Sequence, residues 1–281
     1  MVTRVSRRAL TTTRVQAVDG DSCHERRDQL VTEEPMEIRL CGPGQDPVPL
    51  VVTMRTPGHD FELAAGFCVT EGVVESPAQI ASIAYCLEGQ AEQHHNVVTV
   101  GLRSTVDLAQ LAPRRFVANA SCGLCGKITL DDVESSCAPV ALGPGVSRSV
   151  LVSLPDRLRA AQPLFDATGG LHAAARFDPD GTLVGLREDV GRHNALDKLV
   201  GESALHGALP LVESVLLVSG RMSFEIVQKA AVAGIPVLCA VSAPSSLAVA
   251  AAERLGQTLV GFLRGPRFNV YAHPERVELA S

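Results

Sequence analysis

Aromatic residues are scarce in this sequence. It contains no tryptophan, and phenylalanine and tyrosine together make up 4% of its 281 residues. Hydrophobic residues nevertheless account for 46% of the chain, so a folded interior must be built from aliphatic side chains. A chain of this length and composition is long enough for one large domain or two small ones.

Long apolar runs are missing as well. No stretch approaches the roughly 18–20 apolar residues that a membrane span requires. The first residues, MVTRVSRRALTTTRV, carry charge but lack the apolar core of a secretory signal, so the Arg7-Arg8 pair is expected to be solvated. The sequence therefore predicts a cytoplasmic protein with no membrane partner.

Positive charge is not in excess, because the net charge is −6 and the isoelectric point is about 5.8. A general nucleic-acid binder would need a basic face, so no nucleic-acid partner is expected. The sequence also contains neither GxGxxG nor a Walker A motif. Ordinary dinucleotide and P-loop sites are therefore not supported.

The chain divides by composition. Residues 1–33 are polar and charged without an apolar period, which predicts a flexible N-terminal tail. Residues 34–281 are expected to form a single α/β domain, with a smaller β-rich part over about 34–150 and a layered α/β part over about 151–281. After residue 190, strand and helix patterns alternate three times, which indicates parallel strands covered by helices.

Two helices are predicted before that alternation. One covers about residues 60–70, with His59 or Asp60 as its cap. The other covers residues 151–166, with Ser153 as its N-cap and Pro155 in its first turn.

The segment SCGLCGK places Cys122 and Cys125 two residues apart, and no other pair among the eight cysteines is as close. A structural zinc site usually needs two such pairs, although His94 and His95 could complete one. A thioredoxin-like redox pair remains open. A thiolate that carries sulfur as a persulfide needs an accessible thiol with a lowered pKa, which glycine neighbours and Lys127 would favour. Two unreactive buried thiols are the remaining alternative.

Zinc deaminases also combine histidine and cysteine ligands with an α/β fold. Their signature is H-x-E followed by P-C-x-x-C. The segment LHAAAR supplies His172, but Ala174 stands at the position of the glutamate, and the cysteine pair comes before it. Deaminase chemistry is therefore not expected, whereas a related fold is still possible.

The segment EDVGRHNALDKLVG places Arg192 and His193 at the start of a predicted helix. Helix N-termini bind anions, and both side chains would add to that attraction. An ordinary cap formed by Asp189 or Asn194 explains the same residues equally well.

Further polar residues follow the predicted parallel strands. Ligands bind at the carboxyl ends of such strands, and paired guanidinium groups can grip phosphates. These positions therefore predict a pocket for a phosphorylated ligand, although arginines on a hairpin are often merely solvated. The residues are Ser219, Gly220, Arg221 and Ser223 after one strand, Ser245 and Ser246 after the next, and Arg264 and Arg267 around a Gly265-Pro266 turn.

Five segments, in order, resemble the FdhD family of formate dehydrogenase accessory sulfurtransferases. They are NASCGLCGK, TPGHDFELAAGF, EDVGRHNALDKLVG, SGRMSFEIVQKAA, and GFLRG followed by FNVY. The resemblance covers the chain from about residue 30 to its end. It implies an α/β fold similar to that of cytidine deaminases, with a layered sheet.

The resemblance also implies an enzymatic activity and its partners. Such a sulfurtransferase takes sulfur as a cysteine persulfide from a cysteine desulfurase. It passes the sulfur to the molybdenum or tungsten bis(molybdopterin guanine dinucleotide) cofactor, which it binds as a substrate and which formate dehydrogenase requires. The family implies a homodimer. The alternative is a non-catalytic chaperone that delivers the molybdenum cofactor to formate dehydrogenase.

The resemblance assigns roles to particular residues. Cys122 matches the persulfide carrier and Cys125 matches the second thiol. The cofactor-binding segment of the family matches Phe262, Leu263, Arg264, Gly265, Pro266 and Arg267. The strand-end and helix-start candidates, Arg192, His193, Ser219, Gly220, Arg221 and Ser223, are expected to bind the cofactor's phosphates, and no metal ligands are expected.

Overall fold

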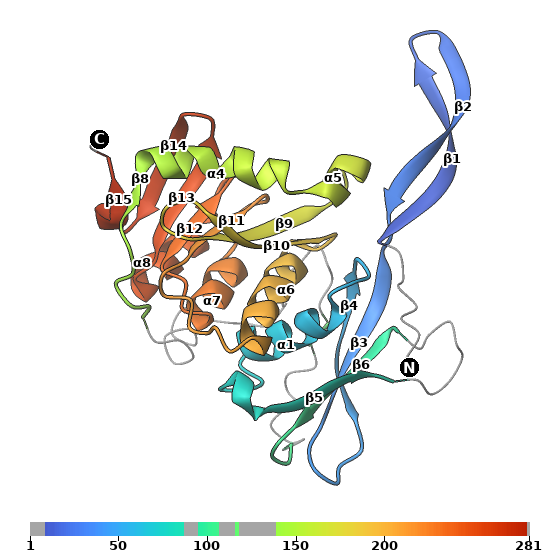
Figure 1. Cartoon of the computed structure of the whole chain (residues 1–281), viewed down its shortest axis with the longest axis vertical. Coiled ribbons are helices and arrows are strands. Elements are labelled where there is room, and N and C mark those ends of the chain that lie inside the picture. Colours follow the sequence, from blue (N-terminus) through green and yellow to red (C-terminus); the bar gives the residue numbers. More distant parts are fainter. Residues whose placement is uncertain (1–8, 87–94, 107–115, 118–138, 280–281) are drawn as a thin grey trace.

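The structure is a computed structural model and describes residues 9–86, 95–106, 116–117 and 139–279. Two β-sheets lie on either side of a set of helices, and further helices lie on the outer side of the larger sheet (Figure 1). The predicted mixed α/β class is confirmed. Within the described ranges no helix has both the length and the apolar character of a membrane span.

The larger sheet has six strands in the order β10-β9-β11-β12-β13-β14. Its central strands β11, β12 and β13 are parallel to one another, and the other pairings are antiparallel. All residues of β11 and β12 are buried, which is why these strands read as unbroken apolar runs. The strands are β9 (His172–Phe177), β10 (Leu183–Asp189), β11 (Val215–Val218), β12 (Val237–Ala240), β13 (Thr258–Arg264) and β14 (Arg267–Ala272).

Helices cover both faces of this sheet. α6 (Arg192–Leu205), α7 (Phe224–Val232) and α8 (Ser246–Leu255) pack on one face, and α4 (Arg148–Ala160) packs on the other. Strand β9 shows the two-residue period that this requires, because Ala174 belongs to the core beneath α6 while Ala173 and Ala175 belong to the core beneath α4. The predicted strand–helix alternation after residue 190 is confirmed.

The helix predicted over 151–166 is two helices with an earlier start. α4 begins after Ser147, whose hydroxyl accepts a hydrogen bond from the Val150 amide at 3.2 Å. Pro155 therefore lies inside α4, and the prediction that Ser153 caps it is wrong. The buried stripe Leu151, Leu154 and Leu158 needs the extra turn. The residue before Pro163 cannot easily remain helical, so α5 (Pro163–Thr168) is separate.

The smaller sheet has five strands in the order β5-β6-β3-β4-β7, and α1 (Asp60–Thr70) packs on it. The predicted helix over 60–70 is confirmed, although His59 at its N-cap makes no side-chain capping bond. The strands are β3 (Glu34–Cys41), β4 (Val48–Arg55), β5 (Ile80–Tyr85), β6 (Val97–Leu102) and β7 (Phe116–Val117); a short 3-10 helix, η1 (Pro77–Gln79), precedes β5.

The two halves join where α1 crosses α6. A Cβ atom at Gly66 would lie 1.8 Å from the Asp197 carbonyl oxygen, and one at Gly201 would lie 1.8 Å from the Glu62 carbonyl oxygen. The helices therefore touch backbone to backbone. Buried residues of both sheets belong to one continuous core.

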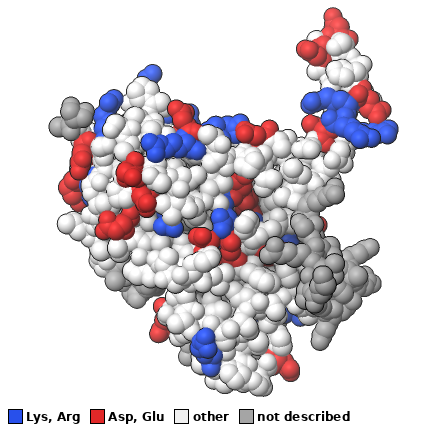
Figure 2. Space-filling model, viewed as in Figure 1, with Lys and Arg blue, Asp and Glu red and all other residues white. Residues whose placement is uncertain are grey.

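An antiparallel arm stands away from the body where a flexible tail was expected (Figure 1). It consists of β1 (Leu10–Asp19) and β2 (Ser22–Val31), paired over their whole length. The two strands are joined by the two-residue loop Gly20-Asp21, and Gly20 has the positive φ of 57° that the first position of such a loop requires. A basic band of Arg14, Arg26 and Arg27 lies midway along the arm (Figure 2).

Two short strands close the α4 side of the larger sheet. β8 (Val146–Ser147) pairs in parallel with β15 (Val277–Glu278), which follows the 3-10 helix η4 (Pro274–Arg276). The Arg276 side chain also donates a hydrogen bond to the Leu142 carbonyl. These contacts fix the segment that leads into α4.

Candidate functional site

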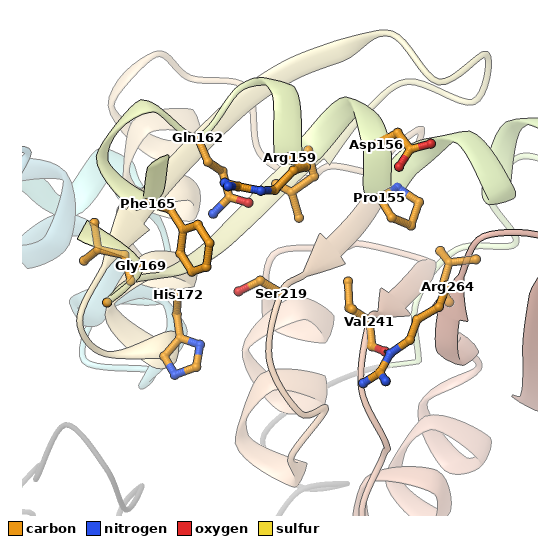
Figure 3. Close-up of a pocket in the computed structure, with 14 residues that line it drawn as sticks. Pro155, Asp156, Arg159, Gln162, Phe165, Gly169, His172, Ser219, Val241 and Arg264 are labelled. Atoms are coloured by element: carbon orange, nitrogen blue, oxygen red, sulfur yellow. The ribbon is translucent and has the colours of Figure 1, made fainter. Parts of the chain in front are cut away.

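A cavity of about 660 Å³ lies between the α4–α5 segment and the carboxyl ends of the central parallel strands (Figure 3). This volume is within the range of small-molecule sites. The cavity is lined by Pro155, Asp156, Leu158, Arg159, Gln162, Phe165, Gly169, Gly170, Leu171, His172, Ser219, Val241, Leu263 and Arg264.

Three adjacent strands contribute residues to this cavity at their carboxyl ends. Ser219 follows β11, Val241 follows β12, and Leu263 and Arg264 end β13. The Ser219 hydroxyl accepts a hydrogen bond from the Ala173 amide at 2.9 Å. Arg264 Nε donates to the Val241 carbonyl at 2.9 Å, while the rest of this side chain is exposed. The structure therefore brings Ser219, Leu263 and Arg264 together.

The opposite wall was not predicted. Arg159 lies over the Phe165 ring at 4.6 Å and pairs with Asp166 at 2.6 Å. Gln162 is only 4% exposed, and its Nε2 atom has no hydrogen-bond partner among the described residues. His172 lies beside Phe165 on the same side of the cavity (Figure 3). The segment LPDRLRAAQPLF indicates helix, but no local pattern states which helix faces the strand ends.

The start of α6 adjoins the cavity through the loop after β11. A Cβ atom at Gly220 would lie 3.3 Å from His172 Nδ1 and 3.8 Å from Arg192 Cδ. Arg192 Nε is buried and has no hydrogen-bond partner within the described part of the chain. A buried guanidinium nitrogen without a partner is a donor that an anion would satisfy.

His193 does not add positive charge to this region. Its Nε2 lies 3.3 Å from the Ser223 hydroxyl and 3.9 Å from a Glu225 carboxylate oxygen. Burial and the positive charges of Arg192 and Lys229 lower the pKa of His193 to about 4. The imidazole is therefore neutral at pH 7 and acts as a hydrogen-bond partner, unlike the cationic anion-binding role that the sequence suggested.

Asp189 fixes the position of α6. Its carboxylate accepts hydrogen bonds from the Gly191 amide at 2.8 Å and from the Asn194 side chain at 3.1 Å. It also pairs with Lys198 at 2.6 Å and accepts from the Thr56 amide at 3.1 Å. Several residues of the segment EDVGRHNALDKLVG therefore hold α6 against the connection between β4 and α1.

The turn after β13 carries the remaining family-matched residues. Gly265, Pro266 and Arg267 are exposed. Phe262 is 43% exposed and has a positive φ of 52°, which is an uncommon backbone conformation for a residue with a side chain. Its amide donates to the Ser242 carbonyl at 3.1 Å.

Other candidates are placed elsewhere. Arg221 is exposed, and Ser245 caps α8 by accepting a hydrogen bond from the Ala248 amide. His95 packs edge-on against Tyr85 at 4.9 Å. The described ranges hold no group of three metal-ligating side chains. The remaining sequence candidates, Cys122, Cys125, Lys127 and His94, lie outside the described residues.

Both the sequence and the fold of this chain are similar to those of known proteins. The model of the FdhD/NarQ family matches residues 31–278. A protein of Streptomyces coelicolor named sulfur carrier protein FdhD is 55% identical over 260 residues, which is 90% of each chain. A Mycobacterium tuberculosis protein of the same name is 47% identical over 272 residues, covering 94% of this chain and 97% of its own.

A solved structure shares the fold. The crystal structure of a formate dehydrogenase accessory protein from Desulfotalea psychrophila superposes with a TM-score of 0.74 and 26% identity. It covers 96% of this chain and 100% of that chain. The family match spans nearly the whole sequence, and the relatives align over most of it. The chain belongs to the FdhD/NarQ family.

Proposed function

We propose that this protein is a sulfurtransferase that carries sulfur for the maturation of formate dehydrogenase. The observation that carries this proposal is the 55% identity, over 90% of both chains, to a protein named as a sulfur carrier. The FdhD accessory role connects the activity to formate dehydrogenase. The layered sheet related to that of cytidine deaminases stays a prediction of the same resemblance.

The proposed first step is exchange of a sulfur–sulfur bond. The Cys122 thiolate attacks the terminal sulfur of a persulfide on a cysteine desulfurase. The sulfur–sulfur bond of the donor persulfide breaks, and the desulfurase cysteine leaves as a thiolate. Cys122 then holds the terminal sulfur as a persulfide. The Cys125 thiolate then attacks the inner sulfur of the persulfide on Cys122. A disulfide forms between Cys122 and Cys125, and the outer sulfur leaves as hydrosulfide. The two cysteine thiols supply the two electrons that reduce this sulfur. A cellular dithiol reductant then restores the pair.

The proposed acceptor is the molybdenum bis(molybdopterin guanine dinucleotide) cofactor, bound as a substrate. Its phosphates need cationic and hydrogen-bonding partners. Candidates are Arg264 at the cavity edge, Arg192, whose Nε has no partner among the described residues, and the loop with Ser219 and Ser223. The neutral His193 would accept or donate one hydrogen bond there without adding charge.

Strand β7, which precedes the cysteine-bearing segment in the sequence, connects through β4 to the start of α6. β7 runs parallel to β4, and Val117 pairs with Val52. The next residue of β4, Thr53, donates a hydrogen bond to Asn194 at the start of α6. Cys122 follows Val117 by five positions, and five residues of chain span at most about 18 Å.

The proposal includes partners and a location. We expect a cysteine desulfurase as donor, formate dehydrogenase as recipient of the loaded cofactor, and a homodimer acting in the cytoplasm.

Intact-mass spectrometry tests the carrier step. The protein is incubated with a cysteine desulfurase and cysteine, and its mass is recorded before and after reduction. Wild type is expected to gain sulfur that a reductant removes, and Cys122→Ala is expected to gain none. Cys23→Ala is the matched control, because Cys23 is an exposed cysteine on the arm. Sulfur loading of Cys122→Ala at the wild-type level would refute the assignment.

The non-catalytic chaperone is distinguished in the same experiment. A chaperone would bind the cofactor without loading sulfur on any cysteine. Restoration of formate dehydrogenase activity by Cys122→Ala, together with undiminished cofactor binding, would support that alternative.

A further inference from the structure

The arm formed by β1 and β2 makes few contacts with the rest of the described structure. Its root touches the body, where Val31 lies against Gly170 beside α5. No residue of either strand is buried among the described parts of the chain, and the arm projects away from the body (Figure 1). A two-stranded hairpin on its own is only marginally stable in water. A second surface that packs on the arm would supply contacts that the described body does not.

The direction of the arm is nevertheless fixed at its root. β2 continues into β3 of the smaller sheet through Thr32 and Glu33 alone. The Thr32 amide donates a hydrogen bond to the Ala9 carbonyl at 2.8 Å, and the Thr11 and Thr32 hydroxyl oxygens lie 2.8 Å apart. The arm therefore extends a strand of the smaller sheet outward and presents its side chains at a set position.

The basic band of Arg14, Arg26 and Arg27 has a charge arrangement that the arm alone does not explain. Arg14 and Arg27 stand directly opposite each other in the ladder, so their side chains share one face. Like charges in such a pair destabilise the pairing of the strands. Glu25 approaches Arg14 at 3.2 Å but leaves the Arg14 side chain 74% exposed, and Arg27 has no ion pair among the described residues. A carboxylate from another molecule would relieve this repulsion.

The sign of the charge reverses between the basic band and the tip of the arm. Asp19 and Asp21 are exposed at the tip, and Figure 2 shows the acidic tip beyond the basic band. A nucleic acid or an anionic bilayer presents negative charge throughout, so the tip and the net charge of −6 would both repel it. A protein surface can present single charges of either sign. The pattern therefore favours a protein partner with carboxylates opposite the basic band.

The arm leaves the smaller sheet at the end toward which β7 runs. Glu34, at the start of β3, pairs with Arg55 at the end of β4. β7 is parallel to β4, and its last residue, Val117, pairs with Val52. Strand β7, which precedes the cysteine-bearing segment in the sequence, therefore points to the root end of the sheet. A protein held by the arm would lie at this same end.

We propose that the basic band docks the protein that donates sulfur, through carboxylates on the surface of that donor. This inference rests on the proposed function, because it takes a persulfide on another protein as the source of the sulfur. Exchange of a sulfur–sulfur bond between two proteins requires their direct contact. The arm holds the donor during this exchange, and Arg14 and Arg27 are its binding residues.

Loading kinetics with two sulfur sources test the inference. The full chain is incubated either with a cysteine desulfurase and cysteine or with glutathione persulfide, a small donor that needs no docking surface. Intact-mass spectrometry records the initial rate of sulfur loading over a range of donor concentrations. The double variant Arg14→Gln, Arg27→Gln is expected to need about 10-fold more desulfurase for half-maximal loading at low salt, in the range for loss of interface arginines. Its loading by glutathione persulfide is expected to keep the wild-type rate.

The double variant Arg103→Gln, Arg254→Gln is the matched control. It removes the same charge from exposed positions away from the arm, because Arg103 follows β6 at the opposite end of the smaller sheet and Arg254 lies in the last turn of α8. Its desulfurase dependence is expected to match that of wild type.

Ionic strength provides a second readout, because salt screens the attraction between exposed charges. An increase from about 0.05 M to about 0.5 M is expected to raise the desulfurase concentration that half-saturates wild type. The difference between wild type and the arm variant is expected to disappear at the higher value. A difference that salt leaves unchanged would overturn the charge-based docking.

The outcomes separate this inference from the proposed function. Half-maximal loading of the arm variant at the wild-type desulfurase concentration would overturn the inference while sulfur carriage stands. An altered oligomeric state with unchanged desulfurase dependence would identify a second copy of this chain as the occupant and would also overturn it. Equally slowed loading of the arm variant by glutathione persulfide would assign the effect to the acceptor and not to docking. Loading of wild type from neither source would refute the proposed function, and this inference with it.

Discussion

Single glycines decide whether α1 and α6 can pack. Gly66 leaves no room for a Cβ atom, since the nearest contact would be Asp197 backbone at 1.8 Å. Backbone atoms of a packed helix cannot move aside as a flexible side chain can.

We expect Gly66→Ala to destabilise the protein by about 3 kcal/mol or more, measured by urea unfolding. Gly145→Ala is the control, because its close contact at 2.5 Å is the mobile carboxylate of Glu278. Equal stability of the two variants would contradict the backbone-to-backbone crossing.

His193 makes stability depend on pH. Its pKa falls from an ordinary 6.5 to about 4, because burial and nearby positive charge disfavour protonation. The unfolded chain therefore binds a proton at a higher pH than the folded chain. As the pH falls from 6.5 toward 4, this difference favours unfolding.

We expect wild type to lose roughly 2 kcal/mol more stability than His193→Gln between pH 7 and pH 4.5. The measurement is the free energy of unfolding at each pH. His206→Gln, at an exposed histidine at the opposite end of the same helix, is expected to behave like wild type. Parallel pH curves for wild type and His193→Gln would refute the lowered pKa.

At the scale of elements, the arm of β1 and β2 is attached to the body only at its root in the described structure. Val31 lies against Gly170, next to α5, while most of the remaining arm is exposed. An isolated two-stranded hairpin is only marginally stable in water.

Removal of residues 9–31 is therefore expected to change the melting temperature of the body by less than about 2 °C, because few contacts are lost. Circular dichroism on heating measures this. A fall of 10 °C or more would mean that the arm stabilises the body.

Sequence patterns predict the elements that obey a local period and miss those set by distant contacts. The buried apolar runs of β11 and β12 and the glycine after α8 predict the elements of the larger sheet and its helices correctly. The arm is missed because its composition is polar and its strands have no apolar period. The start of α4 is misplaced because Pro155 suggests a first turn, whereas packing of Leu151 onto the sheet requires an earlier one.

The candidate site also contains residues that local sequence patterns predict and residues that only distant contacts bring there. Residues that follow parallel strands, such as Ser219 and Arg264, are predictable, because the carboxyl ends of those strands share one edge. Phe165 and Gln162 reach the cavity only because α4 packs on the other face of the sheet and the start of α5 is bonded to Glu188 on β10. That placement is tertiary, so no spacing in the sequence reveals it.

At the scale of the whole molecule, Lys229 links the two halves. It lies on α7 and contacts Asp197 of α6 at 2.9 Å, and Thr70 and Glu71 at the end of α1 at 2.9 Å and 2.6 Å. Burial alone would lower the pKa of Lys229, but the Asp197 and Glu71 carboxylates outweigh it and raise the pKa above 10.5. The Lys229 ammonium is therefore charged at neutral pH and loses its proton only in strong alkali, whereas burial raises the pKa of Asp197, so acid weakens the pair from the carboxylate side.

Lys229→Met is expected to cost about 3–5 kcal/mol, because it leaves buried carboxylates without a counter-charge. Urea unfolding measures the loss. The double variant Lys229→Met, Asp197→Asn should recover part of it. No recovery would show that the loss comes from packing and not from charge.

The contact between Arg276 and Leu142 joins positions 134 apart, and β15 pairs with β8 beside it. During synthesis, the ribosome makes α4 long before it makes Arg276 and β15. The cavity wall on α4 is therefore fixed only after β15 has left the ribosome and paired with β8. A nascent or prematurely ended chain would leave the cavity unassembled, so a ligand could bind there only once the chain is nearly full-length.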